Sequence, residues 1–470
     1  MPRRRGPADR VVVTRVRPNS TVQPTASLRL VRIVVTFIAA LLVWHAASAQ
    51  GDDKPRLLMI SLDGVMPSAY TAAQPVAPTL AALAHEGAWA EGVVGVLPTV
   101  TYPSHTTLIT GVPPAVHGIV DNTVLDPENR SNGAWYYYAS DIKVPTLPMA
   151  ARSRGLRTAA VSWPVTAGMP LDYLVPEYLR SSHEDNLKLV RLLSTPPALL
   201  DAVETSRDMP FRWPMNDRDR TDIAAFILKI FDPHVLLLHL FETDSAAHTY
   251  GPGSPEATEA IRRVDGYVKE LVDIVRGAGR ADRTHIAIVS DHGFLPVKTQ
   301  LQPNALFKQE RLLETDAAGR VTAWQAYFRS SGGSGVVHVK DPASEPRVWA
   351  LLEAIAKNPA NGVRRLWTRA DLAAKGANPD AAFGLDVMDG FYTGAGTDTL
   401  LRPATSRGGH GFDPERPALH ASFILAGPAV RARGSLGVIT MTRIAPTLAS
   451  LLGVGLSPLA DRPLDISGTK

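Results

Sequence analysis

Residues 235–252 read "VLLLHLFETDSAAHTYGP", an apolar run that passes directly into a polar segment. The run at 235–240 has the length of a strand and is short for a helix, so it predicts a buried β-strand. Asp244 and His248 follow four residues apart, and in a helix this spacing puts both side chains on one face. A carboxylate and an imidazole on one face can bind a cation, whereas a helix-capping aspartate beside a surface histidine is the alternative.

Further apolar runs of strand length occur on both sides of this stretch. Helix-compatible segments separate them, and in the longest, residues 255–279, the apolar positions recur at helical spacing. Alternation of this kind predicts an α/β fold with a mostly parallel sheet that helices bury on both faces. The clearest predicted strands are 56–62, 158–163, 234–240, 285–290 and 421–427.

The pattern of predicted elements changes between residues 300 and 407. Stretches such as "SSGGSGVVHV" and "DAAGRVTAW" indicate turns and hairpins rather than alternating strands and helices. We expect residues 50–470 to form one domain that carries an insertion at about 300–407 and returns to the main sheet near His410.

The charge of the chain is concentrated at its start. The 470 residues carry a formal net charge of +4, but residues 1–49 hold eight arginines and one aspartate. The remainder has 41 basic and 44 acidic side chains, a net charge of −3. The body of the chain therefore shows no basic patch that would favour nucleic-acid binding.

Residues 1–49 have the order of an export signal. Arginines precede the apolar stretch 33–44, and Ala47-Ser48-Ala49 fits a cleavage site before Gln50. The stretch is shorter than the roughly 20 residues that span a bilayer, although an uncleaved anchor is the alternative. No later segment reaches that length, so we expect an exported, periplasmic or secreted protein. It has no cysteine, which excludes disulfides and catalytic thiols.

Polar residues follow the ends of the predicted strands, where open α/β sheets form their ligand crevice. Asp-Gly and Gly-rich turns are common, so each of these residues alone has a purely structural alternative. Together they supply oxygen and nitrogen ligands without thiolate, which suits zinc, with manganese or iron as alternatives. Six ligands exceed the three of one open zinc site, so two metal ions are implied. The set is Asp63, Asp244, His248, Asp291, His292 and His410.

A nucleophile is available at Thr101. It precedes Pro103 and a helix-compatible segment, so it is expected near a helix N-terminus, where backbone amides favour an anion. Metal coordination can activate such a hydroxyl for attack. A threonine that only caps the helix is the alternative.

Several motifs, in this order, resemble those of the nucleotide pyrophosphatase/phosphodiesterase (type I phosphodiesterase) family of the alkaline phosphatase superfamily. They are "SLDG", "PTVTYPSH", "HGIVDN", "TDSAAHTYGP", "SDHG" and "GGHG", and the resemblance covers roughly residues 56–452. It implies an alkaline-phosphatase-like three-layer sandwich and a phospho-threonine intermediate on Thr101. It also implies one zinc ion bound by Asp244, His248 and His410, and a second bound by Asp63, Asp291, His292 and Thr101.

The resemblance further implies how a substrate is bound. Asn122 and the backbone amide of Tyr102 would contact a non-bridging phosphate oxygen. The ring of Tyr102, where the family has Phe, would keep an aromatic face for a nucleobase, and Tyr178 is the candidate for a second stacking ring. Ser104 and Thr243 depart from the family's Asn and Pro beside functional positions.

Three classes of function remain open from the sequence. The first is a hydrolase of phosphodiester or pyrophosphate bonds in small molecules, with nucleotide-type substrates favoured. A phosphomonoesterase or a phosphonoacetate-hydrolase-like enzyme on the same metals is the second. A non-catalytic exported metal-binding module is the third. The sequence does not indicate the natural substrate or the oligomeric state.

Overall fold

The structure is a computed structural model that describes residues 53–131, 133–178 and 185–468. The predicted leader, residues 1–49, lies outside these ranges. The chain from Lys54 onward forms one compact unit. Among the described helices, none combines the length and the apolar character needed to cross a membrane.

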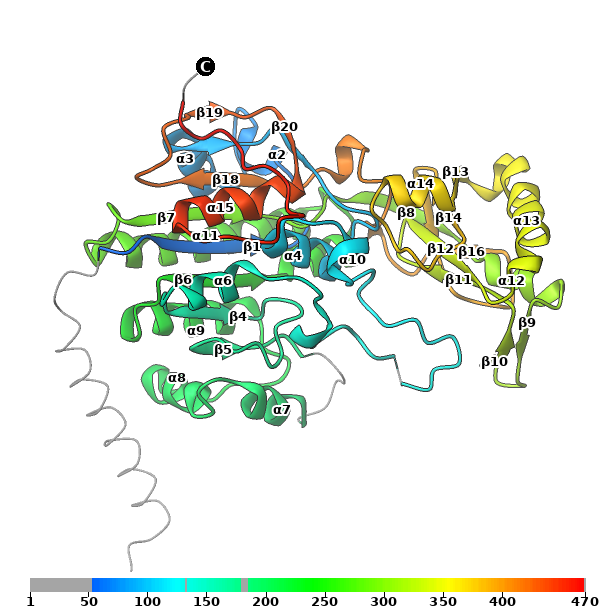
Figure 1. The fold of residues 1–470 in the computed structure, drawn as a ribbon, viewed down its shortest axis with the longest axis horizontal. Coiled ribbons are helices and arrows are strands. Elements are labelled where there is room, and N and C mark those ends of the chain that lie inside the picture. The colour runs from blue at the N-terminus through cyan, green and yellow to red at the C-terminus, as the bar shows by residue number, and fades with distance from the viewer. Residues whose placement is uncertain (1–52, 132, 179–184, 469–470) are drawn as a thin grey trace, which may run out of the picture. The chain divides into compact units, whose positions relative to one another are not determined.

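An eight-stranded sheet lies at the centre of this unit (Figure 1). In spatial order its strands are β19 (Gly434–Ser435), β2 (Ala88–Trp89), β18 (Phe423–Ala426), β7 (Thr284–Val289), β1 (Arg56–Leu62), β6 (Val235–Leu240), β4 (Thr158–Val161) and β5 (Tyr173–Val175). The strands from β7 to β5 are parallel, and β18 is antiparallel to β7. All five predicted strands are confirmed, and β1 has the predicted bounds.

Helices cover both faces of the sheet, as the continuous apolar character of β1, β6 and β7 predicts. One layer contains α4 (Thr101–Thr110), α6 (Leu147–Ser153) and α15 (Ile444–Leu452), and the other contains α3 (Pro78–Glu86), α9 (Asp217–Ile230) and α11 (Pro255–Gly277). In the first layer, Met59 and Leu237 of the sheet share one apolar core with Ile109 and Leu448. The predicted α/β sandwich is therefore confirmed.

Helix α11 shows how local sequence determines where a helix begins and which of its faces is buried. Its N-cap, Ser254, accepts a hydrogen bond from the Ala257 N–H, and Pro255 occupies the first turn, where its missing N–H costs nothing. Val264, Val268 and Leu271 form its buried stripe. The smaller elements of this unit are α2 (Ser68–Thr71), β3 (Gly92–Val94), α5 (Pro114–His117), α7 (Asp185–Leu193), α8 (Leu199–Arg207), α10 (Glu242–Tyr250) and β20 (Val438–Thr440).

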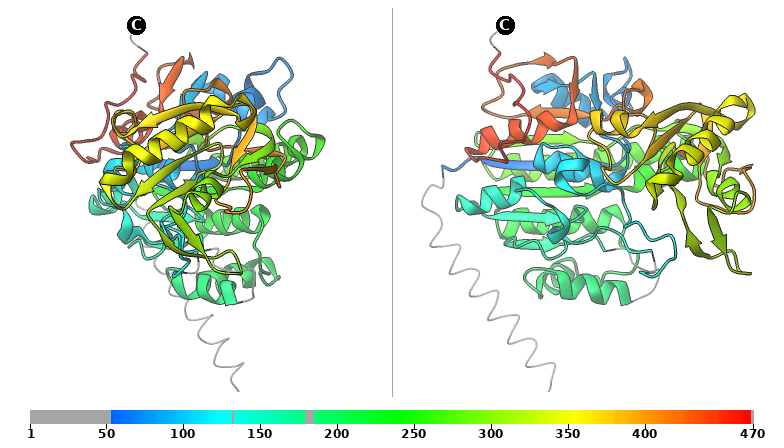
Figure 2. Two further views of the ribbon diagram at one scale, coloured as in Figure 1. Left: turned by 90° about the vertical axis from the view of Figure 1, so that its right-hand side faces the viewer. Right: turned by 45° about the vertical axis from the view of Figure 1, so that its right-hand side comes forward.

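Between β7 and β18 the chain leaves the central sheet and builds a second group of elements. These start with β8 (Leu295–Leu301), continue through the predicted insertion and end with β17 (Gly408–Gly409). They gather beyond the end of the central sheet at which β1 finishes (Figures 1 and 2). The elements are α12 (Pro303–Gln309), β9 (Leu313–Thr315), β10 (Val321–Trp324), β11 (Ala326–Ser330), β12 (Ser334–Val339), α13 (Glu345–Lys357), β13 (Val363–Thr368), α14 (Arg369–Ala374), β14 (Phe383–Val387), β15 (Gly390–Thr393) and β16 (Leu401–Pro403).

The insertion has an apolar core of its own. Its sheet, in the order β11-β12-β14-β13, packs Phe328 and Leu385 against Val348 and Leu352 of α13. The insertion therefore has an apolar core separate from that of the central sheet, and its Tyr392 packs against Gly409 beside the predicted ligand His410.

Candidate metal centre and active site

The six predicted metal ligands follow the strands and turns that end at one edge of the sheet. Asp63 comes directly after β1, and Asp291 and His292 follow β7 one residue beyond its end. Helix α10 begins at Glu242, two residues after β6, so the predicted helical placement of Asp244 and His248 is confirmed. Parallel strands bring these ends together, which explains how positions far apart in sequence meet.

A first cluster consists of Asp244, His248 and His410, whose ligand atoms all lie within 4.8 Å of one another. The two imidazoles face each other, with 3.1 Å between their Nε2 atoms. Each Nδ1 lies beside a backbone carbonyl, that of Gly408 for His248 (2.9 Å) and that of Thr99 for His410 (3.0 Å). With each Nδ1–H donated to its carbonyl, both Nε2 atoms would direct lone pairs toward each other, an arrangement that a cation bound between them would stabilise.

A second cluster consists of Asp63, Asp244 and His292, again within 4.8 Å. The predicted ligand Asp291 borders it, with Oδ2 3.2 Å from His292 Nε2, while its Oδ1 accepts a hydrogen bond from the Gly64 N–H at 3.1 Å. Buried polar atoms normally have partners. Here five ligand atoms are buried without a hydrogen bond, namely Asp63 Oδ1, Asp244 Oδ1, Asp291 Oδ2, His292 Nδ1 and His292 Nε2.

The electrostatics of the two clusters favour a cation. Burial, together with repulsion from Asp291 and Asp244, raises the pKa of Asp63 well above its usual range. Burial lowers the pKa values of His292 and His410 to about 3, so both imidazoles are neutral and able to coordinate. Burial acts to lower the pKa of His248, but the carboxylate of Asp244, 3.4 Å from its Nε2, outweighs this and raises the pKa. The residues present therefore fit a centre for divalent cations.

His410 is fixed by the glycines around it. Gly411 has φ +86°, and a Cβ at this position would lie 1.7 Å from the Ser331 carbonyl oxygen. The Gly333 N–H donates to the His410 carbonyl at 2.7 Å. The glycines thus allow this loop to lie close to the backbone of the insertion.

Thr101 is the first residue of α4, and residues on either side of it in the sequence contact predicted ligands. His105, one turn later, has Nδ1 2.8 Å from the Thr101 carbonyl oxygen and 3.7 Å from Asp291 Oδ2. Two residues before Thr101, the carbonyl of Thr99 accepts from His410. The start of α4 is therefore held against both predicted ligand groups.

Asn122 lies beside the same helix start. The Tyr102 N–H donates to Asn122 Oδ1 at 2.8 Å, so this amide is engaged by the side chain of Asn122 rather than left for a ligand. The bond fixes the orientation of the carboxamide and leaves Nδ2 as the donor that Asn122 can offer.

The rings of Tyr102 and Tyr178 do not present open faces. Tyr102 is 0% exposed, its hydroxyl donates to Glu177 Oε1 at 2.8 Å, and the Trp135 ring meets it edge-on with 5.2 Å between centroids. Tyr178 is 5% exposed, and its ring centroid lies 4.5 Å from that of Tyr137. The aromatic surface expected for stacking a base is, in this structure, packed within the protein.

Neither Glu177 nor His239 is among the residues that the sequence predicts for the site. His239 is buried, with Nε2 3.1 Å from Asp63 Oδ2 and Nδ1 3.0 Å from Glu177 Oε2. Burial acts to lower its pKa, but the bonds to Asp63 and Glu177 raise the pKa to about 10. The available signals were the charged Glu177 in "LVPEYL" and a histidine in the middle of a leucine strand.

Tyr392 of the insertion was also missed. A Cβ added at Gly409 would meet its ring at 2.4 Å, so the ring lies against the residue before His410. Burial and the carboxylates of Asp244 and Asp121 raise the pKa of Tyr392.

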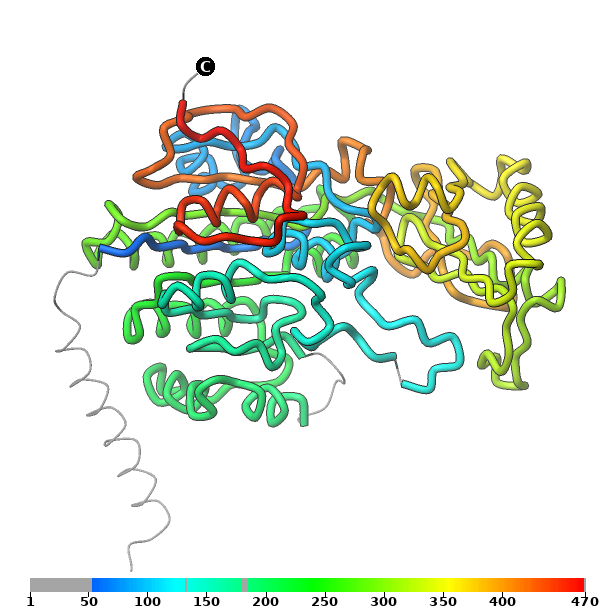
Figure 3. The backbone as a smooth tube through the Cα atoms, in the orientation of Figure 1, coloured from blue at the N-terminus to red at the C-terminus, as the bar shows by residue number. Residues whose placement is uncertain are grey.

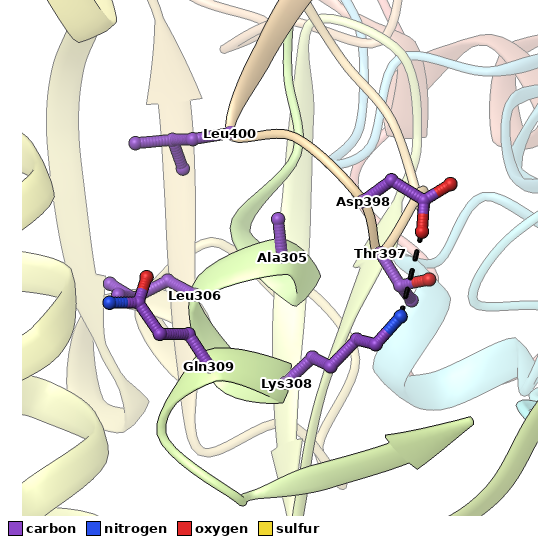
Figure 4. Close-up of a pocket in the computed structure, with 7 residues that line it drawn as sticks. All are labelled: Ala305, Leu306, Lys308, Gln309, Thr397, Asp398 and Leu400. Atoms are coloured by element: carbon purple, nitrogen blue, oxygen red, sulfur yellow. Dashed lines mark ion pairs between the residues drawn. The ribbon is translucent and has the colours of Figure 1, made fainter. Parts of the chain in front are cut away.

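A separate hollow lies on the insertion, between α12 and residues 397–400 (Figure 4). It has a volume of about 350 Å³ and contains one ion pair, Lys308 Nζ to Asp398 Oδ1 at 3.5 Å. None of the predicted site residues lines it, so it is distinct from the clusters described above.

Comparison with protein families gives a match over most of the chain. The family described as type I phosphodiesterase / nucleotide pyrophosphatase matches residues 57–378. Human ectonucleotide pyrophosphatase/phosphodiesterase family member 1 is 26% identical over 253 residues, which are 52% of this chain and 24% of that protein. The chain thus matches about a quarter of the length of that relative.

Other relatives match over a greater length. Human bis(5'-adenosyl)-triphosphatase ENPP4 is 22% identical over 440 residues, 91% of this chain and 84% of that protein. Among solved structures, murine ectonucleotide pyrophosphatase/phosphodiesterase 5, as an inactive variant in complex with AMP, superposes with a TM-score of 0.63 at 19% identity. That superposition covers 88% of this chain and 99% of the other, and it shows a common fold.

Proposed function

Because the chain belongs to the type I phosphodiesterase / nucleotide pyrophosphatase family, we propose that it hydrolyses phosphodiester or pyrophosphate bonds in nucleotide-type substrates. The names of the relatives support this substrate class, since one is a bis(5'-adenosyl)-triphosphatase and another was solved with AMP. In this proposal Thr101 is the nucleophile and the two carboxylate–histidine clusters bind the cofactor.

The cofactor in this proposal is a pair of zinc ions, with manganese or iron as alternatives. Asp244, His248 and His410 would hold one ion, and Asp63, Asp291 and His292 the other, with Thr101 beside them. Bound cations would supply Lewis-acid stabilisation of the negative charge that develops on the reacting oxygens.

The covalent chemistry is assigned to Thr101. Its Oγ forms a bond to phosphorus, the bond from phosphorus to the leaving oxygen breaks, and the hydroxyl proton ends on the departing group. A water oxygen then attacks the phospho-threonine, the Oγ–P bond breaks, and a water proton returns to Thr101. Two easier steps replace one difficult step.

Other groups of the chain would hold the phosphate during these steps. The N-terminus of α4 provides the positive end of a helix dipole at Thr101. Asn122, oriented by the Tyr102 N–H, offers Nδ2 to a non-bridging oxygen. Donors placed where charge develops usually make the largest single contribution to catalysis.

The observation that supports this function most directly is the contact between His248 and His410. Their Nε2 atoms lie 3.1 Å apart beside the carboxylate of Asp244, and the ligand atoms of all three residues lie within 4.8 Å of one another. A bound cation would stabilise that arrangement, which lies beside the helix that begins with the candidate nucleophile.

Export is part of the proposal. An arginine-rich start, an apolar stretch at 33–44 and Ala47-Ser48-Ala49 support cleavage before Gln50 and a periplasmic or secreted enzyme. The N-terminal sequence of the protein recovered outside the cytoplasm tests this directly.

The decisive experiment compares zinc-loaded wild-type protein with Thr101→Ala on bis-p-nitrophenyl phosphate. We expect hydrolysis by the wild type and its loss in Thr101→Ala, with partial activity in Thr101→Ser. Thr71→Ala, which changes an exposed threonine on α2, is the matched control. No hydrolysis by the wild type, or full activity in Thr101→Ala, would contradict the proposal.

Substrate class is tested separately. Rates on p-nitrophenyl phosphate that exceed those on the diester would favour a phosphomonoesterase. Rates on a panel of dinucleotides, nucleoside triphosphates and glycerophosphodiesters then identify the preferred class of substrate. A preference for glycerophosphodiesters would contradict the proposal of nucleotide-type substrates.

A further inference from the structure

Asp121, the residue before Asn122, forms a buried ion pair with the insertion. Its Oδ2 lies 3.2 Å from Nε of Arg329 on β11, and the two side chains are 9% and 7% exposed. Ser331 Oγ donates to the same oxygen at 2.6 Å. The loop that carries Asp121, drawn in cyan between α5 and α6, extends toward the insertion (Figure 3).

Arg329 also contacts the residue after Asn122. Its Nη2 donates to the carbonyl oxygen of Thr123 and lies 3.3 Å from Thr123 Oγ1. One guanidinium therefore binds the side chain on one flank of Asn122 and the backbone on the other. The planar fork of arginine suits such a two-point contact, which a lysine ammonium cannot reproduce.

Asn122 itself is held by the groups that this ion pair orients. Its N–H donates to Asp121 Oδ1 at 2.7 Å, and its carbonyl accepts from the Tyr136 N–H at 3.0 Å. Its side-chain oxygen accepts from the Tyr102 N–H. The direction of Nδ2 is therefore set jointly by α4, by the loop and, through Asp121, by the insertion.

We propose that Arg329 is a positioning residue through which the insertion fixes Asn122 for binding a phosphate oxygen. The inference rests on the function proposed above, because it assigns Asn122 to the phosphate. It goes further in giving the insertion a role in phosphate affinity, although Arg329 lies more than 200 positions from Asn122 in the chain.

Loss of Arg329 should displace Asn122 because the ion pair between Arg329 and Asp121 is buried. Among the described residues, Arg329 has Asp121 as its ion-pair partner. Removal of the guanidinium leaves the carboxylate of Asp121 buried and uncompensated, which is strongly unfavourable, so we expect Asp121 to shift from its place beside Asn122. Movement of Asp121 releases the Asn122 N–H, and a displacement of about 1 Å in a positioning group can cost about 10²-fold in rate.

The experiment uses full-length, zinc-loaded protein and measures two quantities, the inhibition constant of inorganic phosphate against diester hydrolysis and the melting temperature. In Arg329→Gln we expect the phosphate inhibition constant to rise by about tenfold or more. Arg329→Lys should fall between this variant and the wild type. In Asp121→Asn combined with Arg329→Gln, no buried charge remains unpaired, so most of the affinity should return.

Arg56→Gln is the matched control. Arg56, 6% exposed, forms an ion pair at 2.5 Å with Asp232, which is 21% exposed and also pairs with Arg280, at the start of β1, the opposite end of the strand from Asp63. It should lower the melting temperature without changing the phosphate inhibition constant, which separates loss of stability from loss of positioning.

The outcomes are distinct. An inhibition constant in Arg329→Gln within about twofold of the wild type overturns the inference, as does an equal rise in Arg56→Gln. A wild-type protein that neither cleaves diesters nor binds phosphate overturns the proposed function, and this inference with it.

Discussion

His239 connects Asp63 to the interior of the protein. Its Nε2 lies 3.1 Å from Asp63 Oδ2 and its Nδ1 lies 3.0 Å from Glu177, whose other oxygen accepts from the Tyr102 hydroxyl at 2.8 Å. A predicted metal ligand is thus linked to the residue after the candidate nucleophile by a chain of buried hydrogen bonds. Such a chain holds its members in one geometry as long as every member is satisfied.

His239→Leu should therefore weaken metal binding without removing a ligand. Partners behind a ligand orient it, and their loss typically lowers metal affinity by about 10- to 100-fold. Zinc affinity, measured by competition with a chromogenic chelator, checks this. His285→Leu, which changes a buried histidine at the far end of β7, is the control. Equal zinc affinity in His239→Leu and the wild type would show that Asp63 needs no such support.

Zinc should stabilise the fold through the same site. Without a cation, Asp63, Asp244 and Asp291 keep buried oxygens that have no hydrogen-bond partner. A ligand that binds only the folded state at 100 times its dissociation constant adds about 2.7 kcal/mol of stability. We expect the melting temperature to rise when zinc is added to chelator-treated protein, and the rise to shrink in His410→Ala. His85→Ala, at an exposed position on α3, should keep the full shift. A melting temperature that does not respond to zinc would argue against a metal centre here.

A substitution at Gly411 tests the support of His410. Gly411→Ala combines a backbone at φ +86° with a Cβ placed 1.7 Å from the Ser331 carbonyl, so the loop must move. We expect a loss of more than about 1 kcal/mol of stability and a lower zinc content. Gly434→Ala is matched in backbone strain, with φ +93°, but its Cβ meets nothing within 4 Å. If both variants retain zinc equally, the contact with the insertion is not what holds His410.

The sequence predicted the residues of the site that lie in short local patterns. The leucine-rich run before Asp244 predicted β6, and the spacing of Asp244 and His248 predicted their shared helical face, because both patterns are complete within 18 residues. Asp63 and Asp291 could be placed at one edge because parallel strands end together.

What the sequence did not predict depends on contacts between distant segments. Glu177 and His239 are 62 positions apart, and Arg329 is 206 positions from Thr123, so no local pattern links either pair. The burial of Tyr102 also depends on a residue far away in the sequence. An aromatic residue beside the candidate nucleophile predicts a ring face for stacking a base. In the structure, the hydroxyl that distinguishes Tyr from Phe donates to Glu177, and both side chains are buried.

His117 should make stability depend on pH. It is 0% exposed, its Nδ1 accepts from the Ile119 N–H at 3.1 Å, and burial lowers its pKa to about 3. Because the unfolded chain takes up a proton near pH 6.5 and the folded chain does not, stability is fully present above that pH and falls as the pH decreases toward 3. Each such histidine contributes up to about 1.4 kcal/mol per pH unit to the slope of the free energy of unfolding against pH.

Urea unfolding measured between pH 6 and 4 should show a smaller slope in His117→Gln than in the wild type. His85→Gln, which changes an exposed position, should keep the wild-type slope. Identical slopes in all three proteins would mean that His117 can be protonated within the folded state.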